Sequence, residues 1–227
     1  DNNFENAYDM CEKNYSHNEL LDMLQNGSIP EREIAALKFD NIETESDAKV
    51  LVNSLIGCDG KIREAVAHKI HQILLKNPET SKFFFEYADI FAKGTIDINA
   101  NICRLVVDSA VLLKSDSNFS STYSQKILEY TLESLQALDK FIFRDKKYVI
   151  NKQLFKLYWC LEAIKYFYKF IDDDILFNIL QKCALRDDYT IREKTAQILS
   201  NSKKYPQLLQ NLLHDENYYV RIAIKSS

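Results

Sequence analysis

The side chains best suited to chemistry lie between residues 64 and 71. Glu64, His68 and His71 are spaced at i, i+4 and i+7, so an α-helix would place all three on one face. Two imidazoles and a carboxylate are ligands that zinc and non-haem iron accept. The segment lacks the H-E-x-x-H pattern and has no obvious further ligand or general base, so we interpret it as a solvated polar face and expect no metal.

The other reactive residue types do not assemble into a recognisable motif either. The sequence contains no G-x-x-x-x-G-K-[ST] phosphate loop, no G-x-S-x-G elbow and no glycine-rich nucleotide turn. Its five cysteines form no C-x-x-C pair, and we expect mostly buried, reduced thiols, which favours a cytoplasmic location. We therefore predict no catalytic residue and no cofactor. The cysteines are Cys11, Cys58, Cys103, Cys160 and Cys183.

The composition favours a helical protein with a substantial core. The 227 residues are 46% hydrophobic, and four glycines with three prolines supply little of the turn chemistry that a sheet requires. A net charge of -4 argues against nucleic acid as the primary partner. No apolar run approaches the length of a membrane span, so we also expect no membrane contact.

A short repeated pattern indicates which elements position these side chains. R-E-x-x-A starts at Arg32, Arg63 and Arg192, and a fragment of it returns at Arg221. Each of these arginines, four of the seven in the chain, stands four residues after a helix-capping residue type. Because the chain otherwise prefers lysine, arginine at these places suggests a need for a planar, multidentate donor. The capping residues are Ser28, Asp59, Asp188 and Asn217.

Hydrophobic periodicity and capping residues predict helix pairs throughout the chain. Ser28 and Glu31 have the spacing of a capping box, and a polar joint is expected over residues 115–121. The caps, including Asn99 and Asp145, are 29 to 46 residues apart, which fits six helix pairs. The expected helices cover about residues 3–14, 18–25, 45–56, 61–76, 82–91, 99–113, 122–141 and 145–170 (the longest), with further helices starting near Pro30, Asp172, Asp188, Pro206 and Asn217.

The repeated unit resembles the second helix of HEAT-type repeats, including the short HEAT-like repeats of phycobilisome lyases. The likeness is strongest over residues 59–70, 188–199 and 217–223, whereas Cys103 and Val149 stand in place of arginine in the middle repeats. It implies an all-α, right-handed α-solenoid of about six helix pairs. We expect an extra N-terminal helix and cap at residues 1–17, then a single continuous array over residues 18–227 that stops within its last helix. The implied structural repeat positions are Arg32, Arg63, Arg192, Arg221, Asp59 and Asp188.

Some enzymes are also built on HEAT-type repeats, and the sequence can be compared with the residues that each of them uses. Deoxyhypusine hydroxylases bind iron through His-Glu dipeptides, and none of the four histidines here precedes glutamate. The HEAT-like alkylpurine DNA glycosylases act on a basic concave face, whereas this chain is acidic and has one tryptophan. We find no constellation that would hold the chromophore of a bilin lyase. A glycosylase-type or lyase-type enzyme is kept as the alternative to a binding role, as is a regulatory segment of a larger protein.

The helix expected over residues 145–170 carries the candidate binding surface. One apolar stripe along it suffices to pack on a partner helix, and a second aromatic set projects roughly opposite, among charged residues. An aromatic patch with a charged rim is typical of protein-binding hot spots, although internal solenoid helices also have two apolar faces. We therefore expect a non-catalytic scaffold that binds a protein or peptide on its concave or aromatic surface. The candidate binding residues are Phe155, Trp159, Glu162, Tyr166 and Phe170.

Overall fold

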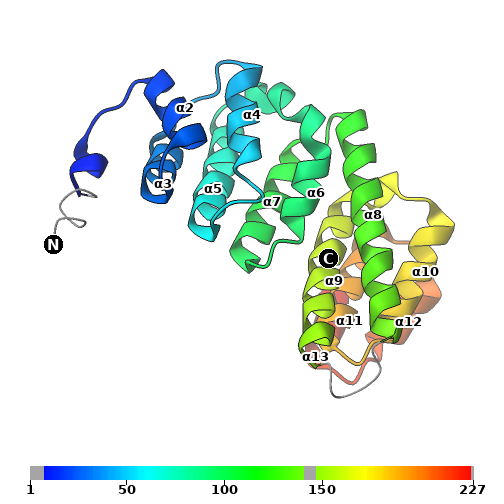
Figure 1. Cartoon of the computed structure of the whole chain (residues 1–227). Helices are drawn as coiled ribbons and strands as arrows, with labels where there is room; N and C mark the ends of the chain where they lie inside the picture. Colours follow the sequence, from blue (N-terminus) through cyan, green and yellow to red (C-terminus); the bar gives the residue numbers. More distant parts are fainter. Residues whose placement is uncertain (1–7, 141–146, 226–227) are drawn as a thin grey trace. The chain divides into compact units, whose positions relative to one another are not determined.

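The computed structural model describes residues 8–140 and 147–225, and within these ranges it contains helices and short joints without a strand (Figure 1). The all-α class predicted from the sequence is therefore confirmed. The chain divides into two compact units, one up to Phe119 and one from Ser120 onward. None of the described helices is both long and apolar enough to cross a bilayer.

The first unit is built from helix pairs that pack side by side. Helix α2 packs on α3 and α4, and α6 packs on α7, while the second helices form a continuous series in which α3 contacts α5 and α5 contacts α7. The elements are α2 (His17–Asn26), α3 (Ile29–Lys38), α4 (Glu45–Asn53), α5 (Gly60–Lys76), η1 (Pro78–Phe83), η2 (Phe85–Tyr87), α6 (Ala88–Thr95) and α7 (Ala100–Leu112).

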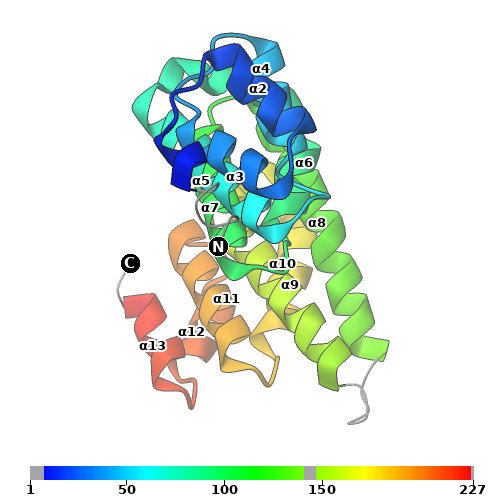
Figure 2. The same cartoon turned by 60° about the vertical axis from the view of Figure 1, so that its left-hand side comes forward.

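The second unit repeats this arrangement. Helices α9, α11 and α13 pack in series, and α10 and α12 pack on each other and on the helices that follow them. The N-terminal ends of α9, α11 and α13 lie along one edge of this unit (Figure 2). The elements are α8 (Ser117–Lys140), which begins within the first unit, α9 (Lys147–Phe167), η4 (Tyr168–Phe170), α10 (Asp173–Ala184), α11 (Tyr189–Ser202), α12 (Pro206–Leu213) and α13 (Tyr218–Lys225).

Most helix starts follow the capping residues that the sequence indicates. Ser28 and Glu31 form the predicted reciprocal capping box at the start of α3. Asp59 accepts a hydrogen bond from the Lys61 amide (2.9 Å), and Asn99 caps α7 in the same way. Asp188 occupies the N-cap position of α11 without a side-chain hydrogen bond to the helix.

Three predicted boundaries are wrong. Residues 82–87 are not α-helical: they comprise the end of η1, Phe84 and η2. Phe84, between the two 3₁₀ elements, packs edge-to-face on Phe91 (6.2 Å between centroids). The expected joint over residues 115–121 is largely helical, because the Asp116 carboxylate accepts the Phe119 amide (2.9 Å) and Phe119 packs on Phe91. The longest described helix is α8 with 24 residues, whereas α9 has 21 and gives way to η4 at Tyr168.

Two predictions fall partly or wholly outside the described residues. The helix expected over residues 3–14 is helical at residues 8–12, and its earlier part lies outside the description. The expected cap Asp145 also lies outside it. The prediction of one continuous array over residues 18–227 stays a prediction, because each compact unit is described by itself.

The motif alanines are buried in the second helices. Ala36, Ala67 and Ala196 are at most 2% exposed, and Ala223 is 8% exposed. A methyl side chain at these sites lets the backbone of each second helix come near its neighbours, since interiors are packed to crystal-like density. The alanine of the repeated pattern thus has a packing reason that is independent of the arginine.

We expect Gly94→Ala to lower the free energy of unfolding by about 1 kcal/mol. A Cβ at Gly94 in α6 would lie 3.1 Å from a methyl group of Val106, which is buried and β-branched. Overpacking costs about 1–3 kcal/mol, more than the gain of about 1 kcal/mol in helix propensity. Urea unfolding checks this, and in a Val106→Ala background the same change should stabilise. If Gly94→Ala stabilises the protein that keeps Val106, α6 and α7 move apart to admit the methyl group at no cost in free energy, and the prediction is wrong.

Candidate functional site

The Arg192 guanidinium ties two inter-helix joints together in the second unit. Its Nε and Nη2 donate to the two carboxylate oxygens of Asp215 at 2.8 and 3.1 Å. Its Nη1 donates to the backbone carbonyls of Arg186 and Asp187, both at 2.8 Å. Asp215 also accepts the Asn217 amide at 2.9 Å, so the joint before α11 is fixed to the joint before α13.

The first unit contains the same arrangement around Arg63. Its Nε and Nη2 donate to Asp97 at 2.8 and 3.1 Å, and its Nη1 donates to the Cys58 carbonyl at 2.6 Å. Asp97 in turn accepts the Asn99 amide at 2.9 Å. Arg63 and Arg192 therefore make the same bidentate bond to an aspartate, and Arg63 donates to one backbone carbonyl where Arg192 donates to two. Each arginine joins its own helix start to the start of the next second helix.

The remaining repeat positions keep parts of this pattern. Arg221 donates to the carbonyls of Asp215 (2.6 Å) and Glu216 (3.0 Å). Arg32 donates instead to the Leu24 carbonyl (2.9 Å) and to the Ser54 hydroxyl (3.2 Å). Within the described residues, neither Arg32 nor Arg221 makes a bidentate bond to an aspartate.

Cys103, which replaces arginine in the sequence pattern, keeps one of the arginine's hydrogen bonds. Its thiol donates to the Asp97 carbonyl at 2.9 Å. That carbonyl lies six residues before it, at the spacing that Arg192 and Arg221 also use. The cysteine therefore makes the same local contact as the arginines.

The aspartate partners were missed in the sequence. Asp97 and Asp215 each stand two residues before an asparagine cap, in the segments Asp97-Ile98-Asn99 and Asp215-Glu216-Asn217. This recurring D-x-N pattern is the signal that could have found them. Burial raises the pKa of the Asp215 carboxyl, but hydrogen bonds from Arg192 and Asn217 outweigh it and hold the pKa below its usual value.

The predicted binding residues on α9 are partly exposed rather than fully exposed or fully internal. Phe155, Trp159 and Tyr166 are of intermediate exposure, and Phe170 is 40% exposed after the end of the helix, in η4. Trp159 packs edge-to-face on Tyr158 (5.2 Å), and its indole Nε1 is buried without a hydrogen-bond partner. The aromatic set is thus only partly covered by its own unit's contacts.

Glu162 lies at the centre of a charged cluster that joins α9 to α11. One of its oxygens accepts from Lys165 at 2.8 Å and the other from Lys194, which is 8% exposed. The ammonium of Lys194 also lies 5.0 Å from the ring centroid of Tyr158 and donates to the side-chain Oε1 of Gln197 at 3.2 Å. Burial lowers the pKa of Lys194, but the bond to Glu162 outweighs it and raises the pKa above its usual value.

The histidine face on α5 is engaged by α7. The Asn101 amide donates to Glu64 at 2.5 Å and lies 3.3 Å from His68 Nε2. Of the cysteines, Cys103, Cys160 and Cys183 are buried, as expected, and burial raises the pKa of the Cys160 and Cys183 thiols to about 12. Cys11 is exposed, against the expectation of buried thiols.

Exposed tyrosines along one edge of the second unit were also missed. Tyr189, Tyr218 and Tyr219 are 42%, 60% and 55% exposed, and the rings of Tyr189 and Tyr219 stack at 6.1 Å. A hollow of about 650 Å³ in the same unit is lined by Leu185, Arg186 and acidic residues, without a histidine or Trp159 among its lining. The signal was an aromatic residue directly after the caps Asp188 and Asn217.

Comparisons with known proteins concern the fold alone. No family model and no curated protein matches the sequence. Among solved structures, the chain is similar to the crystal structure of an engineered protein from the Northeast Structural Genomics Consortium, with a TM-score of 0.50 and 15% identity. The match covers 93% of this chain and 94% of that chain.

We expect Asp215→Asn to destabilise the protein at pH 7 by about 1.5–3 kcal/mol, the size of a hydrogen bond to a charged group. Because the folded pKa of Asp215 lies below its usual value, its contribution is present above pH 4 or so and is lost as the pH falls through the folded value. In urea unfolding, the difference in unfolding free energy between the parent and Asp215→Asn should therefore be smaller at pH 3 than at pH 7. The exposed Asp139→Asn is the matched control, and a difference that persists in acid would contradict the ion pair.

We expect Glu162→Gln to lower the free energy of unfolding by about 1–3 kcal/mol at pH 7, since it leaves the buried Lys194 without its anion. Because the folded pKa of Lys194 is raised, this contribution is complete below the usual lysine pKa and fades as the pH rises through the folded value. Chemical unfolding measures the loss. Adding Lys194→Met should recover much of the lost stability, because no unpaired ammonium remains. A double variant as unstable as Glu162→Gln alone would show that the unpaired Lys194 is not the cause of the loss.

Proposed function

We propose that the chain is a non-catalytic, HEAT-like α-solenoid scaffold that binds a protein or peptide partner. Support for the solenoid comes from repetition of one contact set in both units. The second helices pack in series, and Arg63 with Asp97 is matched by Arg192 with Asp215. Arrays of this kind present extended surfaces whose usual role is recognition.

The partner is assigned to the surface that α9 and α11 form in the second unit. The observation that carries this is the cluster in which one carboxylate, Glu162, holds two lysines beside partly exposed aromatic side chains. Lys165 and Lys194 against one Glu162 leave a single positive charge, so a carboxylate in the partner segment fits the site. Buried charges with fixed partners orient a ligand without losing further side-chain entropy on binding.

Aromatic side chains supply the binding energy in this proposal. Phe170 is 40% exposed, and Trp159 and Tyr166 are partly exposed along the same stretch of chain. Aromatic anchors beside partly buried charges are the composition of interface hot spots, where a few residues dominate the affinity. The partner class is therefore a polypeptide segment with apolar side chains and at least one acidic group.

Affinity capture from the natural host, followed by binding measurements with the captured protein, tests this function. We expect Tyr166→Ala with Phe170→Ala to weaken the binding at least about tenfold, because hot-spot truncations cost about 2 kcal/mol or more. Lys165→Glu should weaken it as well by reversing the local charge. Circular dichroism checks that each variant is folded.

The matched control is Tyr218→Ala with Tyr219→Ala, which removes two more exposed rings from the edge of the same unit. That pair should leave the affinity unchanged. Binding that survives the α9 changes and is lost with the edge tyrosines would move the interface to the edge. If both double variants bind the partner as tightly as the parent, neither aromatic surface of this unit is the binding site and the proposal is wrong.

A further inference from the structure

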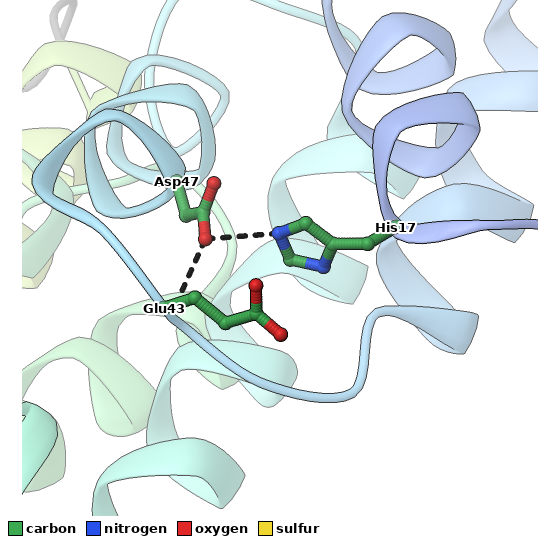
Figure 3. A group of neighbouring side chains, drawn as sticks. All are labelled: His17, Glu43 and Asp47. Atoms are coloured by element: carbon green, nitrogen blue, oxygen red, sulfur yellow. Dashed lines mark hydrogen bonds and ion pairs between the residues drawn. The ribbon is translucent and has the colours of Figure 1, made fainter.

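The side chain of His17 meets two carboxylates from a distant part of the sequence, Glu43 and Asp47, in the first unit (Figure 3). His17 is the first residue of α2, Glu43 lies in the joint before α4, and Asp47 lies in the first turn of α4. One ligand atom from each lies within 4.8 Å of the other two. Both carboxylates are turned toward the imidazole ring of His17.

The distances match those of ligands that share one metal ion. His17 Nε2 and Asp47 Oδ2 are 2.9 Å apart. Zinc binds imidazole nitrogen and carboxylate oxygen at about 2.0–2.2 Å, so two atoms at that separation subtend roughly 90° at a shared ion. The ligand atom of the exposed Glu43 lies within 4.8 Å of both, so its carboxylate has to move inward to complete the site.

Two of the three ligands are held in place before any ion binds. Asp47 is 3% exposed, and its Oδ2 accepts the amides of Glu43 (2.9 Å) and Thr44 (3.2 Å). The His17 ring packs on Phe39 with 5.1 Å between ring centroids. A fixed imidazole and a fixed carboxylate lose little entropy on binding an ion, which leaves the exposed Glu43 as the ligand that closes the site.

We propose that His17, Glu43 and Asp47 form a divalent transition-metal site that joins the start of α2 to the start of α4. One imidazole with two carboxylates suits Zn²⁺, whereas sites for Mg²⁺ or Ca²⁺ are built from oxygen ligands alone. Water fills the remaining coordination positions. On binding, the ion replaces the hydrogen bond between His17 and Asp47, and the neutral imidazole gives its nitrogen lone pair to the metal.

This site departs from the expectation of no metal, and it uses neither of the two histidines that the sequence singled out, His68 and His71. His17 and Asp47 are 30 positions apart, so no local spacing reveals the group. The proposal is independent of the α9 surface, because every ligand belongs to the first unit. Its role is to fasten two neighbouring helix pairs.

Isothermal titration of the tag-free, chelator-treated chain with Zn²⁺ at pH 7 tests the site. We expect one equivalent to bind and the melting temperature to rise, since an ion that binds only the folded state stabilises it. Glu43→Gln and His17→Gln should each weaken the affinity at least about tenfold. Glu43→Gln is the cleaner variant for folding because the Glu43 side chain is exposed.

His71→Gln is the matched control, because it removes a histidine from the same unit outside the cluster, and its affinity for Zn²⁺ should equal that of the parent. Absence of saturable binding by the folded parent would overturn the proposal. Equal affinity in the parent and in both ligand variants would overturn it as well, by showing that zinc is held elsewhere, for example by Cys11. Cobalt substitution adds a visible spectrum that should change with His17→Gln.

Discussion

The paired guanidinium and carboxylate in each unit is the interaction on which the arrangement of the second helices depends. Backbone carbonyls in the joint before a helix have no partner within a regular helix, and burying such a carbonyl without a hydrogen bond is costly. Arg192 satisfies two such carbonyls and reaches Asp215 with its remaining donors. A lysine offers a point charge on a flexible stem and would not fix both joints at once. The rest of the packing follows from this fixed distance between helix starts.

Apolar packing and the arginine contacts serve different purposes. The buried alanines, such as Ala67 and Ala196, set how closely the second helices approach, and the aromatic contacts of Phe91 with Phe84 and Phe119 fill the space between helices. These contacts are nondirectional and supply the main driving force for burial. Directional bonds at the helix starts then select one register among several that would bury similar area.

Local rules predicted the helix starts well, and tertiary contacts explain the errors. Caps such as Ser28 and Asn99 act within one turn, so their residue types suffice. The serine-rich segment expected to be a joint is largely helical because the Phe119 ring is buried against Phe91. Hydrophobic periodicity does not predict this tertiary contact. The arginine positions were visible as a repeat, whereas their aspartate partners required pairing across 23 to 34 positions. The cluster around Asp47 joins three elements, and only the fold brings them together.

The thiol at Cys103 has a consequence for how such a chain can diverge. A thiol that donates to the local carbonyl stands where the second unit has the Arg192 guanidinium with four acceptors, yet α7 still packs on α5. In the solenoid that we propose, each helix pair touches only its neighbours, so the effect of such a replacement stays confined to one contact between pairs. Single positions of the pattern can then change one at a time, and the periodicity of the sequence can fade while its helices still stack.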